Sequence, residues 1–211
     1  MYRKLSIIIS VIMHPLLMTS FIFLLLFQFA PNAISPLDTQ SMNNIVLAVL
    51  VTTCVLPVVS IASLQYSNGL LKQGLSTLTL PGKRERVLPV FFTFLFYGIT
   101  TYMFMVKLQL TNVLVVVLGG SSVIVLLVSL CSFFLRVSTH SAGVGSLIGY
   151  LLTIGLKYEY SKLMIPLVIA LILSGLVMSA RLYLNVHKPL DVLVGSLIGL
   201  GVSAGSVVLF G

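Results

Sequence analysis

The segment SARLYLNVHKPLD, residues 179–191, gathers an arginine, a histidine, a lysine and an aspartate in a chain that otherwise avoids charge. His187 lies six residues after Arg181 and four residues before Asp191. A carboxylate that binds one ring nitrogen of a histidine fixes its tautomer and leaves the other nitrogen to act as a base or nucleophile. The planar guanidinium of Arg181 suits an oxyanion, and phosphate is the obvious one. The spacing therefore predicts phosphate chemistry in this segment.

Two further loops carry groups that suit an anion. In RVSTHSAG, residues 136–143, His140 and Ser138 lie at the junction of two apolar runs. The helix expected to follow offers free N–H groups and the positive end of its dipole to an anion. The segment PGKRERVLP, residues 81–89, places three cations within four positions, and these are Lys83, Arg84 and Arg86.

Transmembrane helices must position these groups. The 211 residues are 58% hydrophobic and 8% charged, and the mean hydropathy is +1.16. Apolar runs of spanning length recur to the last residue, which predicts one integral membrane domain, 1–211, rather than a signal peptide before a soluble domain. The spans must be helical because the backbone has to satisfy its own hydrogen bonds in lipid. We expect an all-α polytopic transmembrane helical bundle of about seven helices, with six as the alternative, at roughly 5–30, 43–66, 88–106, 113–135, 141–157, 163–183 and 189–210.

The charged residues gather on one side of the expected bundle. With seven helices, the loops after the second, fourth and sixth helices lie on the same side of the membrane as the N-terminus. Those loops hold all three polar segments described above. The net charge of +8 lies in short loops at helix ends, without the extended basic surface that nucleic-acid binding uses. We therefore expect contact with bilayer lipids and phosphate, and no nucleic acid.

Glycines four residues apart occur in the fifth and seventh expected helices. This spacing of small residues lets membrane helices approach closely, so we expect these two helices to pack together. The alternative is that glycine is simply common in membrane helices. The pairs are Gly145/Gly149, Gly195/Gly199 and Gly201/Gly205.

The remaining polar residues have weaker signals. His14 lies inside the first expected span, where a polar group is a functional candidate by default. The alternative is that His14 bonds a backbone carbonyl freed by Pro15. The two cysteines, Cys54 and Cys131, lie inside apolar runs and are interpreted as small buried hydrophobes. Isolated cations at helix ends are interpreted as solvated groups or head-group anchors; these are Lys4, Lys107, Lys157 and Lys162.

The three polar segments resemble the motifs of the type-2 phosphatidic acid phosphatase (lipid phosphate phosphatase) superfamily, which shares its site with vanadium haloperoxidases. The pattern of that family has three parts: Lys-x6-Arg-Pro, Pro-Ser-Gly-His and Ser-Arg-x5-His-x3-Asp. The third part matches here as Arg181-x5-His187-x3-Asp191, with the serine displaced by one position to Ser179. This third part is the specific one.

The second part of the pattern matches as Ser138-Thr139-His140. Val137 replaces the family's proline, and Thr139 replaces its glycine.

The first part of the pattern departs most from the family. Counting back from Arg86, the family's lysine falls on Thr79, and the nearest proline downstream is Pro89 rather than the adjacent residue. Lys83, Arg84 and Arg86 are therefore taken to share the role of this part. The resemblance covers about residues 79–195, and it places a catalytic core at about 79–211.

The resemblance implies a role for each matched residue. His187 would attack phosphorus to give a phosphohistidine, Asp191 would orient His187, and His140 would protonate the departing lipid oxygen. Water would then release phosphate. The family needs no metal, and no cofactor is expected. The groups that would hold the phosphate oxygens are Arg181, Ser138, Lys83, Arg84 and Arg86.

We therefore expect a membrane lipid phosphatase that hydrolyses a lipid phosphate monoester or pyrophosphate. The sequence does not choose among phosphatidic acid, phosphatidylglycerol phosphate, undecaprenyl pyrophosphate and a lipid A phosphate. The altered first motif supports the alternative, a non-catalytic lipid-binding or transport protein on the same fold. A vanadate-dependent oxidase is a third and more distant alternative, because those relatives are mostly soluble.

The expected location is a bacterial inner membrane. The distribution of charge, read by the positive-inside rule, favours a cytoplasmic active face. Much of that charge belongs to the proposed site, however, and bacterial members of the family mostly face the periplasm. The resemblance thus favours a periplasmic active site.

Overall fold

The computed structural model describes residues 2–31, 39–67, 83–108 and 113–211, with the side chains of all of these except 2, 39, 64–67 and 83–90. These ranges contain helices and no strand. Two π-helical segments, Val51–Val55 and Met103–Lys107, join α3 to α4 and extend α5, and a 3-10 turn, Ser161–Leu163, precedes α8. The α-helices are α1 (Tyr2–Ile12), α2 (Pro15–Phe29), α3 (Thr39–Leu50), α4 (Leu56–Ser67), α5 (Lys83–Tyr102), α6 (Val113–Cys131), α7 (Thr139–Lys157), α8 (Met164–Tyr183) and α9 (Pro189–Phe210).

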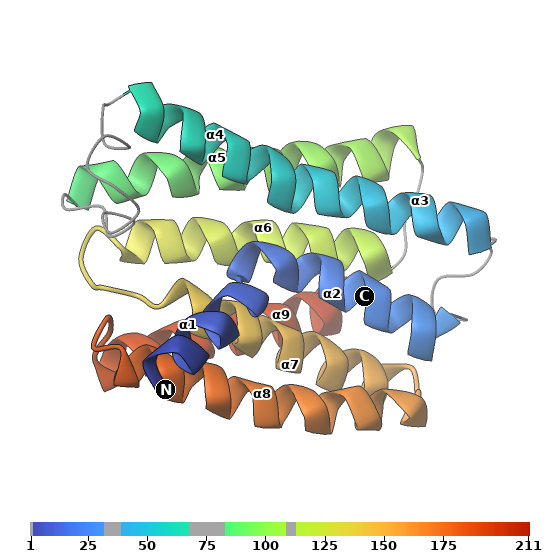
Figure 1. The fold of residues 1–211 in the computed structure, drawn as a ribbon. Helices are drawn as coiled ribbons and strands as arrows, with labels where there is room; N and C mark the ends of the chain where they lie inside the picture. Colours follow the sequence, from blue (N-terminus) through green and yellow to red (C-terminus); the bar gives the residue numbers. More distant parts are fainter. Residues whose placement is uncertain (1, 32–38, 68–82, 109–112) are drawn as a thin grey trace.

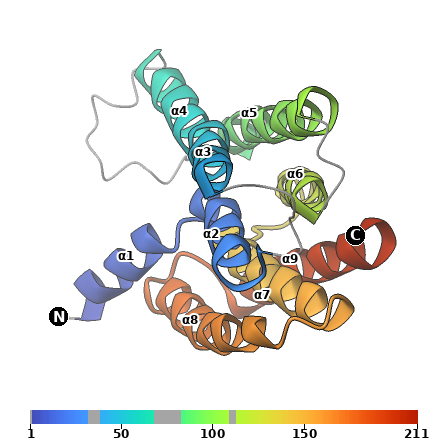
Figure 2. The same ribbon diagram turned by 90° about the vertical axis from the view of Figure 1, so that its right-hand side faces the viewer.

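The helices form an all-α bundle in which α7 is central. Figure 1 shows α2 to α9 running along one common direction, and the view along the bundle in Figure 2 places α2, α8 and α9 around α7. Every residue of α7 from 141 to 151 is buried. A helix that is buried on all faces belongs to the interior of a bundle, so α7 is the element from which the site is built.

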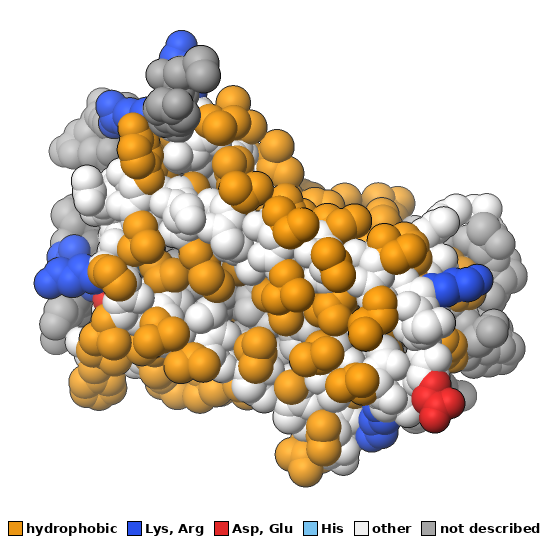
Figure 3. Space-filling view, turned by 90° about the horizontal axis from the view of Figure 1, so that it is seen from below, with side chains coloured by type: hydrophobic (Ala, Val, Ile, Leu, Met, Phe, Trp, Pro, Cys, Tyr) orange, Lys and Arg blue, Asp and Glu red, His pale blue; other side chains and the backbone are white. Residues whose placement is uncertain are grey.

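The outer surface of the bundle is apolar. The face of the molecule in Figure 3 carries hydrophobic side chains across its middle, and its charged side chains lie toward the ends. On α8, Ile165, Val168 and Ile172 have more than half of their side-chain surface exposed. A soluble protein would not leave so continuous an apolar surface in water. The protein is therefore an integral membrane protein with a polytopic helical bundle.

Four helical segments within the described ranges are long and apolar enough to cross a membrane by themselves: Gln40–Ser63, Val113–Cys131, Ser161–Tyr183 and Pro189–Phe210. A bent pair, Arg3–Ile12 with Pro15–Phe29, makes a fifth span if it is counted as one. The segment Phe91–Lys107 is apolar but shorter, and α7 is not in this group. All seven expected spans are helical over most of their length, but three of them, 5–30, 88–106 and 141–157, are not long and apolar enough to cross a membrane as single helices.

The first expected span, 5–30, is wrong as a single helix. The chain bends by 57° between α1 and α2. Pro15 occupies the first turn of α2 and has no N–H to continue the helix from α1. His14 has an extended backbone and caps α2 by accepting a hydrogen bond from Leu16 N at its Nδ1 atom, 3.3 Å away. The proline therefore splits one apolar run into two helices.

Two expected boundaries near the site also differ by a few residues. The fourth span was expected to reach residue 135, but α6 ends at Cys131 and a turn follows. The fifth was expected to begin at residue 141, but α7 begins at Thr139 because Ser138 caps it. The seventh span, 189–210, matches α9.

The glycines explain how closely α7 and α9 approach. A Cβ atom on Gly145 would lie 2.5 Å from the carbonyl oxygen of Ser196, and a Cβ atom on Gly199 would overlap the carbonyl oxygen of Ala142. Gly149 and Gly195 face the partner helix in the same way. The predicted packing of these two helices is thus confirmed for two of the three glycine pairs. The third pair does not face α7, because no atom of the described residues lies within 4 Å of a Cβ atom on Gly201 or Gly205.

Candidate active site

The loop between α6 and α7 and the turn between α8 and α9 lie at the same end of the bundle (Figure 1). A backbone hydrogen bond from Ser138 N to Asp191 O, 3.1 Å long, joins the two connections. Asn185 has a φ of 52°, a left-handed conformation that asparagine tolerates and that reverses the chain after α8. The second and third sequence motifs are therefore brought together at one end of the bundle, as the order of the expected helices predicted.

His187 and Asp191 form the local pair that the sequence suggested. Their Nδ1 and Oδ2 atoms are 3.8 Å apart, and their side chains are only 15% and 13% exposed. Asp191 lies in the first turn of α9, which begins at Pro189 as expected, and its Oδ2 atom accepts a hydrogen bond of 2.9 Å from Lys188 N. The carboxylate is thus held in place by the helix start. The Nδ1–Oδ2 distance is short enough for an ion pair but too long for a hydrogen bond.

His140 lies in the first turn of α7 and contacts two groups from the N-terminal helices. Its Nε2 atom is 3.1 Å from the carbonyl oxygen of Ser10 in α1. Its ring lies edge-on to the ring of His14, with 5.5 Å between the centroids and 80° between the planes. The Nδ1 atom of His140 is buried and has no hydrogen-bond partner within the described ranges. Neither contact is predicted by the sequence motifs.

Arg181 lies in the last turn of α8 and is half-buried. Its charge interacts electrostatically with the rings of His14 and His140, and the ring of His187 also interacts with His140. The Nε atom of Arg181 is buried without a hydrogen-bond partner among the described residues. A buried donor that is left unsatisfied is costly. A bound anion would satisfy both this donor and the positive charge.

Ser138 has a structural role that the motif comparison did not reveal. It is fully buried, and its hydroxyl oxygen accepts hydrogen bonds from the backbone N–H and the hydroxyl of Ser141, at 3.3 and 2.9 Å. It therefore caps α7 and fixes the position of His140 two residues later. Contact between Ser138 and phosphate stays a prediction.

The first motif lies outside what the structure describes in detail. Lys83, Arg84 and Arg86 belong to the first turn of α5, but their side chains are outside the described set. Thr79, where the family's lysine would fall, is outside the described residues altogether. The phosphate-binding role of these cations stays a prediction.

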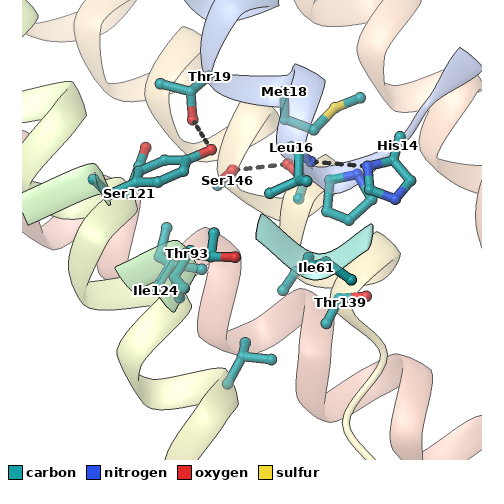
Figure 4. A pocket seen from close by; sticks show the side chains of 16 residues that line it. His14, Leu16, Met18, Thr19, Ile61, Thr93, Ser121, Ile124, Thr139 and Ser146 are labelled. Atoms are coloured by element: carbon teal, nitrogen blue, oxygen red, sulfur yellow. Dashed lines mark hydrogen bonds between the residues drawn. The ribbon is translucent and has the colours of Figure 1, made fainter. Parts of the chain in front are cut away.

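A cavity of about 200 Å³ enters the bundle next to Thr139, the neighbour of His140 in the chain, and His140 itself does not line it. His14 and Thr139 line it, and it continues between α2, α4, α5, α6 and α7 toward Tyr97 and Ser121 (Figure 4). Its wall is mostly apolar and is interrupted by hydroxyl groups. Arg181, His187 and Asp191 do not line it. Within the described ranges, no cluster of three His, Cys, Asp or Glu side chains could hold a metal ion.

The comparison with known families agrees with this geometry. Residues 55–211 match the model of the PAP2 superfamily, the type-2 phosphatidic acid phosphatases. The match covers well over half of the chain, so the protein belongs to this superfamily, as the motif resemblance predicted. Members of the superfamily are in general phosphatases of the lipid phosphatase type, and membership supports a phosphoric ester hydrolase here. Neither a curated protein nor a solved structure matches the chain.

Proposed function

We propose that the protein is a membrane lipid phosphatase that hydrolyses a lipid phosphate monoester or pyrophosphate through a phosphohistidine on His187. One observation carries this proposal: a paired histidine, a second histidine and a partly buried arginine, whose Nε donor has no partner among the described residues, converge at one end of the bundle. A structural ion pair would need no second histidine and would leave no buried guanidinium donor unsatisfied.

The first half of the reaction transfers the phosphoryl group to the protein. Asp191 lies next to Nδ1 of His187, so Nε2 is the atom that attacks phosphorus. The P–N bond forms as the bond between phosphorus and the lipid oxygen breaks. His140, protonated on both ring nitrogens at this stage, donates the proton on Nδ1 to the departing oxygen, which leaves as a lipid alcohol, or as a lipid monophosphate if the substrate is a pyrophosphate. Arg181 stabilises the charge on the non-bridging oxygens.

The second half returns the protein to its starting state. Water attacks the phosphohistidine, the P–N bond breaks and inorganic phosphate leaves. His140 takes the proton from the attacking water, which restores the proton that it gave to the leaving group. Lys83, Arg84, Arg86 and Ser138 supply the further phosphate contacts that the family pattern implies.

The substrate's head group enters at the charged end while its tail lies among the helices in the bilayer. The candidate substrates are phosphatidic acid, phosphatidylglycerol phosphate, undecaprenyl pyrophosphate and a lipid A phosphate. We place the protein in a bacterial inner membrane with the site on the periplasmic face, as in most bacterial members of the family.

The test is phosphate release by the purified protein in detergent, with a chelator present, from a panel of lipid monophosphates and pyrophosphates. We expect release by the wild-type protein and none by His187→Ala, because the variant has no nucleophile. Circular dichroism would check that the variant keeps its helical content. Release that persists in His187→Ala would contradict the mechanism, and no release from any lipid would favour the non-catalytic binder or transporter.

A further inference from the structure

The N-terminal helices α1 and α2 lie before residue 55, outside the family match, and yet they contact a residue of the proposed site. The two contacts are the carbonyl of Ser10 in α1 and the ring of His14 at the bend between α1 and α2. Both contacts involve the ring of His140. Ser138 caps α7 and so fixes the backbone of His140, but it does not fix the orientation of the His140 ring.

The carbonyl of Ser10 determines which nitrogen of His140 carries the hydrogen. A carbonyl oxygen can only accept a hydrogen bond, so Nε2 of His140, 3.1 Å away, must be the N–H. Nδ1 then carries the lone pair in the neutral ring, and it is the atom that gains the proton when His140 becomes the general acid. Because Nδ1 is buried without a partner among the described residues, it is the atom of His140 that is left for chemistry.

His14 is itself held in a defined orientation. Its Nδ1 atom accepts the hydrogen bond from Leu16 N that caps α2, so its neutral ring carries the hydrogen on Nε2. The cap fixes the ring, and the ring stands at 80° against that of His140. His14 also lines the cavity together with Thr139, the neighbour of His140 in the chain (Figure 4).

We propose that His14 is a positioning residue for the proposed phosphatase reaction: its ring packs against that of His140 and keeps Nε2–H on the carbonyl of Ser10, so that Nδ1 is the atom that takes up a proton and delivers it to the leaving group. This inference rests on the proposed function, and it adds a part of the site that the family motifs do not include. It replaces the interpretation of His14 as a partner for a freed carbonyl, since the His14 ring accepts from a backbone N–H instead.

The alternative is that His14 only caps α2, and a pair of variants separates the two roles. His14→Asn retains a side-chain oxygen that can accept from Leu16 N, so it preserves the cap but removes the ring. His14→Ala removes both. We expect His14→Asn to retain the wild-type melting temperature while its kcat for phosphatidic acid falls about 10- to 100-fold, the usual effect of losing a group that orients a catalytic side chain. A wild-type kcat in His14→Asn would overturn the proposal.

A second readout uses two leaving groups. The alcohol of phosphatidic acid is a poor leaving group that needs the proton of His140, whereas nitrophenolate leaves without one. We expect His14→Asn and His140→Ala to slow hydrolysis of phosphatidic acid much more than hydrolysis of nitrophenyl phosphate, and His187→Ala to abolish both. An equal loss on the two substrates in His14→Asn would overturn a role through His140.

A third measurement does not depend on turnover. The chain has three histidines, so nitrogen-15 labelling of histidine gives three sets of ring signals. His140→Ala identifies the signals of His140. We expect the Nε2–H tautomer in the wild-type protein and a mixture of tautomers in His14→Asn. Unchanged His140 signals in His14→Asn would overturn the inference even if the protein proved not to be a phosphatase.

Discussion

The two ends of the bundle both carry cations, but the structure uses them differently. At the end away from the site, Lys157 donates hydrogen bonds from Nζ to the carbonyls of Val207, Val208 and Gly211, at 3.0, 3.3 and 2.7 Å. At the site, Arg181 has a buried Nε atom without a partner in the described part of the chain. One cation is satisfied by a helix C-terminus, where the dipole favours it. The other would be satisfied by an anion bound in the proposed site.

The difference shows that the number of cations does not locate a phosphate site. The hydrogen bonds of Lys157 are made to carbonyls of the protein itself, so this cation does not require a bound anion. Arg181 is half-buried and interacts with two histidine rings, and its Nε atom has no partner among the described residues, so a bound anion would stabilise its charge. The hydrogen-bond partners of each cation, rather than its charge, distinguish the end that carries the proposed site from the end that carries Lys157.

The largest effect is expected from matched exchanges of arginine and lysine at the two ends. Arg181→Lys keeps the charge but loses the planar fork, so we expect kcat for phosphate release to fall about 100-fold. Lys157→Arg, the control, should leave kcat unchanged because it lies at the far end. Steady-state kinetics with the preferred lipid would measure both. If Arg181→Lys stayed within twofold of wild type, the distinction between the two ends would not hold.

The next effect concerns the helix packing that carries the site. Gly199→Ala would place a methyl group against the carbonyl of Ala142, two residues from His140. We expect α7 and α9 to be forced apart, with a loss of about 1–3 kcal/mol of stability and a lower kcat. Gly201→Ala on the same helix meets open space and should behave as wild type. Thermal unfolding in detergent would compare the two, and equal melting temperatures would refute the packing argument.

The smallest effect is expected at the structural end. Lys157→Met removes the cation that caps α9, so we expect a stability loss of about 0.5 kcal/mol and no change in kcat. Thermal unfolding and the phosphate-release assay would be run on the same preparation. A marked drop in kcat without a drop in stability would mean that this end also takes part in the reaction.

The parts of the site that are local in sequence could be predicted. The pair His187 and Asp191 is separated by four residues across the start of α9, so the motif spacing alone places the carboxylate beside the ring. The packing of α7 on α9 could also be predicted from the sequence, because glycines four residues apart indicate that two membrane helices approach closely. The spacing of Arg181, His187 and Asp191 also predicted the family, and the match over residues 55–211 confirms it.

The contacts from the N-terminal helices could not be predicted in the same way. His140 meets the carbonyl of Ser10 across 130 residues of sequence, and the contact depends on the bend at Pro15. This bend could not be predicted from the hydrophobicity of residues 5–30, because hydrophobicity indicates how long an apolar segment is and not whether its helix is straight. The pair His14–Pro15 was the available signal, since a proline inside an apolar run marks a helix boundary.

The most direct test of the central claim is to trap the covalent intermediate. The wild-type protein would be mixed with a lipid substrate labelled with phosphorus-32, quenched within milliseconds and separated from free label. We predict label on the protein that survives alkali and is lost in acid, as a phosphohistidine is, and that is absent from His187→Ala but present in Lys157→Arg. Phosphate release without any label on the protein, or label that persists in His187→Ala, would contradict the account.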